Sequence, residues 1–113
     1  KAALPGVSIL LMSPMDRGVR GESGEIQTIA SLPKLVSLEE GVARELNVAF
    51  FNTYQAMGGE GTMGRWYTAE PRLVGADFIH PLPAGAKVVG GLLYKALRDG
   101  FQDYKLRQLG VRN

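Results

Sequence analysis

Residues 37–51 read SLEEGVARELNVAFF, and this stretch decides the fold class because it joins a helix directly to a strand. The segment 37–40 has the spacing of a capping box, in which a serine hydroxyl and a glutamate three residues later cap a helix N-terminus. Apolar residues then recur every four positions, at Leu38, Val42 and Leu46. One helix face is therefore apolar and is expected to pack on something. Asn47 is expected to end the helix.

Two short apolar runs flank this helix in the sequence. The run Val48–Phe51 follows it after one residue, and the run Val7–Met12 precedes it and stops at Ser13-Pro14. Nearly continuous apolar character is typical of parallel strands buried on both faces. A strand, a connection that contains a helix and a second strand predict a parallel crossover, and thus an α/β fold.

The remaining segments are less regular. Residues 16–24 are polar and rich in glycine. Over residues 25–35 the signals for secondary structure are mixed, and Pro33 argues against one continuous helix there. Residues 52–75 are interpreted as a long loop that contains Trp66. An amphipathic helix is expected from about Pro83 onward. Inside it, Gly90-Gly91 suggests close packing against a strand.

Composition excludes several classes of protein. The chain has 113 residues, 45% hydrophobic and 21% charged, which is typical of one small soluble globular domain. It has no cysteine and one histidine, so disulfide frameworks, thiolate metal sites and multi-histidine centres are excluded, and no cofactor is expected. No apolar run is long enough to span a membrane, and the first residues lack the apolar core of a signal peptide.

Positive charge gathers near the C-terminus. Residues 86–113 hold six basic side chains against Asp99 and Asp103, a net of +4. A solvated helix face explains this better than a phosphate-binding patch, because no nucleic-acid motif accompanies it. We therefore expect no nucleic-acid partner.

The segment Asp77-Phe78-Ile79-His80 carries the clearest chemical signal. An acid three residues before a histidine can accept a hydrogen bond from one imidazole nitrogen and leave the other free as a base. His80 is the candidate base and Asp77 the candidate orienting acid. The spacing alone is weak evidence, since a surface histidine with Asp77 as a helix cap has the same pattern.

Several separate segments resemble the SGNH (GDSL-type) hydrolases, whose Asp-x-x-His motif precedes the final helix. The matching segments are 12–16 (MSPMD), 42–45 (VARE), 48–54 (VAFFNTY), 56–61 (AMGGEG) with Trp66, 76–81 (ADFIHP) and 83–86 (PAGA). The resemblance implies a three-layer α/β/α flavodoxin-like fold with a parallel sheet. It also implies a serine esterase acting on short acyl esters of small molecules or glycans, such as O-acetyl groups, in which His80 is the base and Asp77 its acid. On the same resemblance, an extracytoplasmic location is favoured.

The chain departs from this family in two ways. Leu82 stands where relatives often have a threonine or serine that caps the last helix. More seriously, the Gly-Asp-Ser block that supplies the family's nucleophile is missing, as are the blocks that supply the oxyanion hole. The serines present are Ser8, Ser13, Ser23, Ser31 and Ser37. Gly21-Glu22-Ser23 is similar to the missing block, but no buried strand precedes it. Residues 1–113 are therefore expected to be the C-terminal part of one SGNH domain, inactive without its N-terminal segment.

Two alternatives stay open. The chain could be a non-catalytic binding or structural domain that kept this part of the fold. Trp66 and the glycine-rich stretch before the Asp-x-x-His motif could wall a substrate pocket, or Trp66 could simply cover the core.

Overall fold

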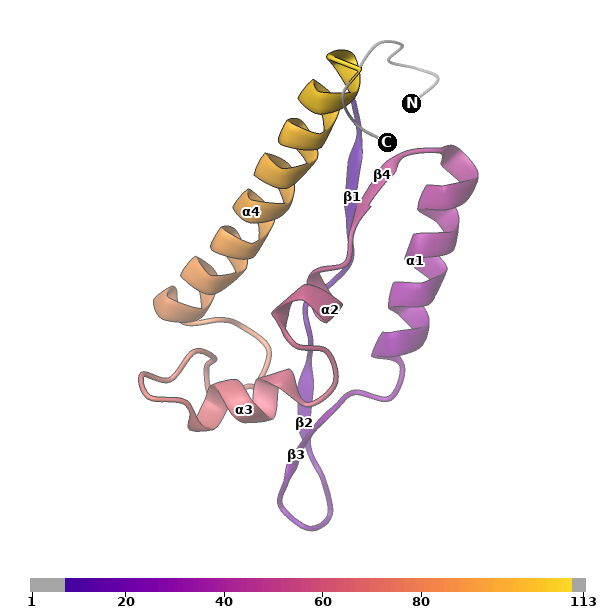
Figure 1. The fold of residues 1–113 in the computed structure, drawn as a ribbon. Coiled ribbons are helices and arrows are strands. Elements are labelled where there is room, and N and C mark those ends of the chain that lie inside the picture. The colour runs from indigo at the N-terminus through magenta and orange to yellow at the C-terminus, as the bar shows by residue number, and fades with distance from the viewer. Residues whose placement is uncertain (1–7, 111–113) are drawn as a thin grey trace.

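The computed structural model describes residues 8–110. Val7, the start of the first expected strand, and Arg112, in the basic C-terminal segment, lie outside the described residues. The elements follow in the order β1 (Leu10–Met12), β2 (Gly18–Arg20), β3 (Ile26–Thr28), α1 (Leu32–Leu46), β4 (Ala49–Phe51), α2 (Thr53–Met57), α3 (Thr62–Thr68) and α4 (Pro83–Gln108). Figure 1 shows their arrangement.

Strands β1 and β4 pair in parallel, with Leu10 opposite Ala49 and Met12 opposite Phe51. Helices α1 and α4 lie on opposite sides of this pair, so the layers run helix, sheet, helix (Figure 1). The predicted α/β fold with a parallel sheet is confirmed. Burial of the first strand on both faces is wrong for the described residues, because Leu10 and Met12 are 39% and 40% exposed.

Helix α1 begins five residues before the predicted capping box. Pro33 occupies the first turn of the helix, where its missing N–H has no intrahelical partner to lose. Ser37 therefore lies inside the helix and caps nothing, so the capping-box prediction is wrong. The predicted end is confirmed: Asn47 adopts a left-handed conformation, φ 56° and ψ 48°, and its N–H bonds the carbonyls of Ala43 and Arg44.

Helix α1 carries two apolar stripes. The buried stripe, Leu32, Val36 and Ala43, faces the sheet. The predicted stripe through Leu38, Val42 and Leu46 is the outer one, and these side chains are 46–68% exposed. Within residues 8–110 this stripe stays about half or more exposed and is not the face that packs on the sheet, contrary to expectation.

The irregular segments contain structure that the sequence patterns did not reveal. Strands β2 and β3 form an antiparallel hairpin, closed by a turn that includes Gly24 at φ +89°. Each strand has three residues, too few for an alternating pattern to show. The predicted loop 52–75 contains the short helices α2 and α3, so it is wrong as a structureless loop.

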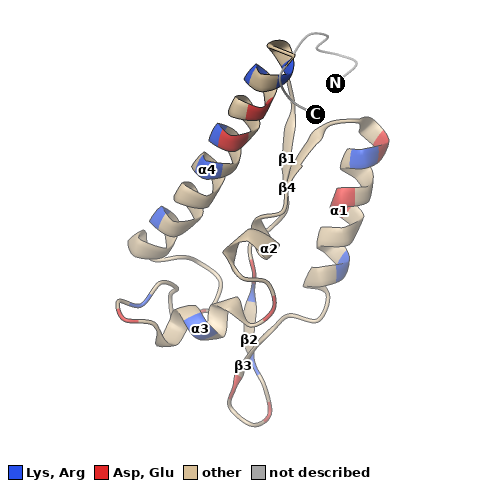
Figure 2. Ribbon diagram, in the orientation of Figure 1, with Lys and Arg blue, Asp and Glu red and all other residues tan. Residues whose placement is uncertain are grey.

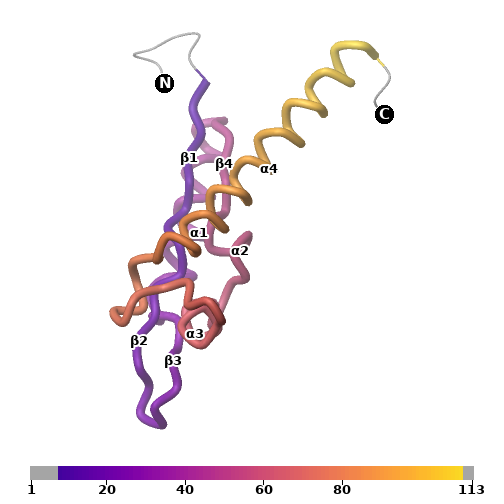
Figure 3. The backbone as a smooth tube through the Cα atoms, turned by 90° about the vertical axis from the view of Figure 1, so that its left-hand side faces the viewer, coloured from indigo at the N-terminus to yellow at the C-terminus, as the bar shows by residue number. Residues whose placement is uncertain are grey.

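Helix α4 begins at Pro83 as predicted and runs for 26 residues. Its C-terminal half extends away from the rest of the molecule (Figure 3). The expected strand contact at Gly90-Gly91 is wrong, because an added Cβ at either position would meet open space. The close approach is at Gly85, where a Cβ would lie 2.0 Å from the Leu73 carbonyl oxygen.

One of the two buried clusters of the core is built around α3, and the other lies between α1 and β4. Met57, Met63, Trp66 and Val74 form a buried cluster, each 8% exposed or less. Leu73, Phe78, Val89 and Leu92 pack against it, so α4 and the segment before it share this core.

Candidate active site

The segment between α3 and α4 is a closed loop held by its own backbone. Val74 bridges Pro81, the Gly75 N–H donates to the His80 carbonyl at 2.9 Å, and the Phe78 N–H donates to the Gly75 carbonyl at 3.0 Å. The loop is also tied to the hairpin, because the Gly18 N–H donates to the Phe78 carbonyl at 2.8 Å. Backbone bonds within the loop and one bond to the hairpin thus hold Asp77 and His80 in position.

Asp77 and His80 form the pair that their spacing predicts. Asp77 Oδ2 lies 2.6 Å from His80 Nδ1. Asp77 Oδ1 accepts hydrogen bonds from the backbone N–H groups of Ile79 at 2.9 Å and His80 at 3.1 Å. The carboxylate therefore holds both the ring and the backbone of the residue that it orients.

The ring contact fixes which nitrogen carries the proton. The hydrogen bond from the His80 ring, and after it those from the Ile79 and His80 backbone, hold the pKa of Asp77 well below its usual range. An ionised carboxylate only accepts hydrogen bonds, so His80 Nδ1 is the donor. In the neutral ring, His80 Nε2 then presents a lone pair. It has no hydrogen-bond partner within residues 8–110 and belongs to a side chain 82% exposed. An oriented imidazole with a free Nε2 can accept a proton.

Asp77 does not cap helix α4. The N-cap of α4 is Leu82, and no side chain bonds the first turn. Leu82 leaves the cap to be supplied by another side chain or to be missing, and the N-cap makes no side-chain bond in the described residues. The Asp77 carboxylate instead accepts hydrogen bonds from the backbone of the loop and from the imidazole.

Trp66 lies in the hydrophobic core at 7% exposure, in contact with the cluster around Met63. This position agrees with its interpretation as a residue that covers the core. Its role in substrate binding stays a prediction.

No serine hydroxyl of the described chain bonds His80. Ser13 is 5% exposed, and its Oγ accepts the Tyr54 N–H at 3.2 Å and donates to the Pro14 carbonyl. Ser23 lies in the turn of the β2–β3 hairpin, and Ser37 lies within α1. The structure brings together the acid and the base, and it places no serine with them.

A group of buried polar residues follows the carboxyl ends of β1 and β4. Asp16 is 1% exposed, accepts the Met63 N–H at the start of α3 at 2.9 Å, and leaves Oδ1 without a partner. Thr53, also 1% exposed, has an unpartnered Oγ1. Burial and the Asp16 charge raise the pKa of Tyr54. Sequence reasoning assigned these residues no role, although polar residues directly after buried strands are a signal of a ligand-binding edge.

A cavity of about 160 Å³ lies between the segment after β1 and the Asp77–His80 loop. It is lined by Pro14, Met15, Asp16, Arg17 and Ile79. It therefore joins the carboxyl end of the sheet to the residue that precedes His80. The part of the chain that the structure describes contains no group of three metal-ligating side chains and no helix long and apolar enough to cross a membrane.

Comparison with known proteins gives structural neighbours only. No protein-family model matches the chain, and no curated protein sequence matches it. A structure described as "Peptidoglycan O-acetylesterase in action, 5 min" matches 90% of the chain at a TM-score of 0.75 and 21% identity. The esterase domain of the ZfL2-1 ORF1 protein, from the zebrafish ZfL2-1 retrotransposon, matches 87% at a TM-score of 0.56 and 21% identity.

These matches cover 29% of the O-acetylesterase chain and 50% of the retrotransposon chain. A structural match at 21% sequence identity shows similarity of the fold alone. The chain therefore has a mixed α/β fold with a parallel sheet, similar to one part of the structure described as a peptidoglycan O-acetylesterase.

Proposed function

We propose that this chain carries the acid and base of a serine ester hydrolase, with His80 as general base and Asp77 as its orienting acid. The observation that carries the proposal is the 2.6 Å contact between Asp77 Oδ2 and His80 Nδ1, which leaves Nε2 unbonded on an exposed ring. In a hydrolytic triad the carboxylate fixes the tautomer and stabilises the imidazolium, and the other ring nitrogen accepts the nucleophile's proton.

The nucleophile belongs to another polypeptide segment in this proposal. Residues 1–113 are the C-terminal part of an SGNH hydrolase domain, and a preceding segment supplies the serine and the oxyanion hole. Two features of residues 8–110 support this: the parallel sheet has only two strands, so each has an unpaired edge, and the outer stripe of α1 is exposed. The chain also spans a minority of the O-acetylesterase that it matches.

The reaction then follows the acyl-enzyme route. The serine Oγ attacks the ester carbonyl carbon while His80 Nε2 takes the hydroxyl proton, and the Asp77 carboxylate stabilises the imidazolium. When the tetrahedral intermediate collapses, the C–O bond to the alcohol breaks and the alcohol oxygen takes the proton from Nε2. Water then attacks the acyl-serine with the same base, the acid leaves, and the serine recovers its proton. No metal or cofactor takes part.

The substrate class is a short acyl ester of a small molecule or glycan. The cavity beside Ile79 has room for a small acyl group. One structurally similar protein is described as a peptidoglycan O-acetylesterase. O-acetyl groups on a glycan are the substrate that we propose. Such a substrate would place the protein outside the cytoplasm.

The test measures hydrolysis of p-nitrophenyl acetate and of an O-acetylated glycan by the protein that contains the complete domain. His80→Ala is expected to abolish activity, and Asp77→Asn to lower kcat by about 10²–10⁴ because the imidazole loses its orienting acceptor. Asp99→Asn is the matched control, since Asp99 also pairs at 2.6 Å, with Lys95 on α4. It should keep full activity. Hydrolysis unchanged in His80→Ala would overturn the assignment.

A further inference from the structure

Phe78, which lies between the acid and the base, has an unusual backbone conformation. Its φ is 61°, in the left-handed region. Within residues 8–110, Asn47 is the only other non-glycine residue with positive φ. Asparagine visits this region readily, whereas a bulky aromatic residue does so rarely and only where its surroundings hold it there. Strained residues of this kind gather at functional sites.

The surroundings of Phe78 hold its backbone on both sides. Its N–H donates to the Gly75 carbonyl at 3.0 Å, and its carbonyl accepts the Gly18 N–H at 2.8 Å. The second bond requires glycine on the hairpin. A Cβ on residue 18 would lie 2.8 Å from the Phe78 Cβ, 2.9 Å from the Ile26 side chain and 3.1 Å from the Met63 side chain. The hairpin thus reaches the loop by main-chain contact.

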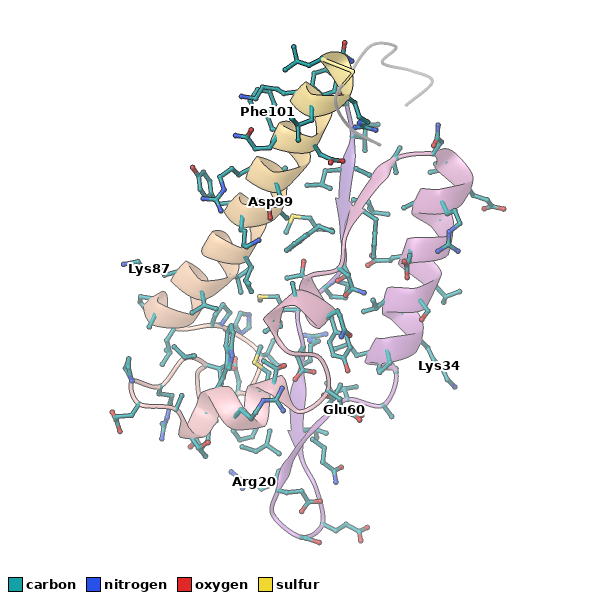
Figure 4. The ribbon with its side chains drawn as sticks, in the orientation of Figure 1. Arg20, Lys34, Glu60, Lys87, Asp99 and Phe101 are labelled. Atoms are coloured by element: carbon teal, nitrogen blue, oxygen red, sulfur yellow. The ribbon has the colours of Figure 1, made fainter. Side chains whose placement is uncertain are left out.

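The ring of Phe78 anchors the same residue in the core. It meets Tyr67 of α3 edge to face, with 5.0 Å between centroids and 89° between planes. The guanidinium of Arg20 lies 5.4 Å from the ring centroid. Arg20 extends from the hairpin (Figure 4). The ring also packs on the cluster that includes Met63 and Trp66. Contacts from β2, α3 and the core therefore all meet at this side chain.

We infer that Phe78 is a positioning residue for the Asp77–His80 pair, and this inference rests on the proposed function. The left-handed turn at Phe78 brings the backbone N–H groups of residues 79 and 80 to Asp77 Oδ1 while Oδ2 holds the imidazole. The partly buried ring, packed on the core, and the Gly18 bond keep the turn in place on an otherwise exposed loop. The β2–β3 hairpin is thereby part of the device that orients the base.

The primary test reads the His80 tautomer by ¹⁵N NMR in the protein that contains the complete domain, with His80→Gln identifying the signals. Phe78→Ala removes the anchor and should shift the imidazole away from the Nδ1–H form. It should also lower kcat about 10- to 100-fold, with KM changed by no more than about twofold. Phe78→Tyr keeps the ring and should restore both. Phe101→Ala, the same truncation on the far half of α4, should leave the tautomer unchanged.

Two further variants keep the test decisive. Phe78→Leu replaces Phe78→Ala if the latter does not fold, and Gly18→Ala perturbs the turn without changing Phe78. A folded Phe78 variant with the wild-type tautomer and kcat would overturn the inference. Full activity in His80→Ala would instead overturn the proposed function and leave the tautomer measurement standing, so the two failures are distinguishable.

Discussion

The two ends of this molecule differ in how completely the chain covers its own apolar surface. At the site end, Met63 and Val74 are fully buried, and a closed loop carries Asp77 and His80. At the sheet end, Leu38 is 68% and Phe101 57% exposed. Phe101 projects from α4 in Figure 4. These two side chains belong to helices on opposite sides of the sheet (Figure 1), and both stay more than half exposed. Contacts within residues 8–110 thus bury the core that supports the acid–base pair, whereas they leave apolar side chains around the sheet exposed.

Helix α4 also carries charged side chains. Figure 2 shows Lys and Arg interspersed with Asp and Glu along the C-terminal half of α4. Lys95 pairs with Asp99 at 2.6 Å, four residues along the helix. Such exposed pairs add little stability. The charges of α4 keep one side of the helix in water, whereas Leu93, Leu97 and Phe101 line an apolar hollow of about 370 Å³ against β4. That hollow is part of the exposed sheet end.

The largest effect on stability is expected from a cavity in the buried core at the site end. Trp66→Ala should lower the free energy of unfolding by about 3–5 kcal/mol, because it removes a large buried ring from the core and leaves a cavity. Urea denaturation of the complete protein measures this. Trp66→Phe, which keeps an aromatic ring in place, should cost clearly less. A loss below about 1 kcal/mol for Trp66→Ala would mean that this core is not the stable part of the molecule.

A second prediction contrasts two glycines of α4. Gly85→Ala should destabilise by about 3 kcal/mol, since its Cβ would overlap the Leu73 carbonyl and approach the Trp66 ring. Gly91→Ala, on the same helix in open space, should stabilise by about 1 kcal/mol through helix propensity. Thermal melts of the two variants give the comparison. If both variants changed stability in the same direction, this result would contradict the close packing of α4 at its start.

A third prediction concerns the outer stripe of α1. If another segment of the domain covers it, Leu38→Ala should cost about 2 kcal/mol in the complete protein. Glu45→Ala, at an exposed polar position of the same helix, should stay within about 0.5 kcal/mol. Chemical denaturation distinguishes them. A Leu38→Ala protein as stable as the wild type would show that the stripe faces water, and would remove one support of the half-domain proposal.

The smallest effect is expected in the pH dependence of the stability that Asp77 contributes. The folded-state pKa of Asp77 lies below its ordinary value of 3.8, so the stability that its hydrogen bonds contribute is present above about pH 4 and is lost as the pH falls through the folded-state pKa. Asp77→Asn lacks this contribution. The stability difference between wild type and variant should thus be largest near neutral pH and shrink in acid, as measured by urea denaturation between pH 7 and 2. A difference that grows in acid would contradict the sign of the shift.

Local signals predicted the elements that depend on neighbouring residues alone. Asn47 ends α1 because asparagine tolerates the left-handed conformation, and Pro83 opens α4 because proline suits a first helical turn. Pro33 correctly argued against one continuous helix over residues 25–35, since that range holds β3 and the helix begins only at Leu32, with Pro33 in its first turn. The spacing of Asp77 and His80 predicted their contact because three residues of a tight loop span that distance.

Burial could not be predicted in the same way. The periodicity of α1 is compatible with either stripe facing inward, and only the position of β4 and Tyr54 shows that Leu32 and Val36 do. The β2–β3 hairpin escaped detection because its three-residue strands are stabilised by contacts with α3 and the Asp77–His80 loop, far away in sequence.

The amino-acid sequence by itself determined the order of strand, helix and parallel strand, the final helix, and an acid placed to orient a single histidine. Each depends on periodicity, backbone preference or short spacing, which act within a few residues. The tertiary structure decided which faces are covered, that Trp66 belongs to the core, and that Phe78 takes a left-handed turn. These depend on contacts such as Gly18 with Phe78, 60 residues apart in the chain, whose free energy no local pattern encodes.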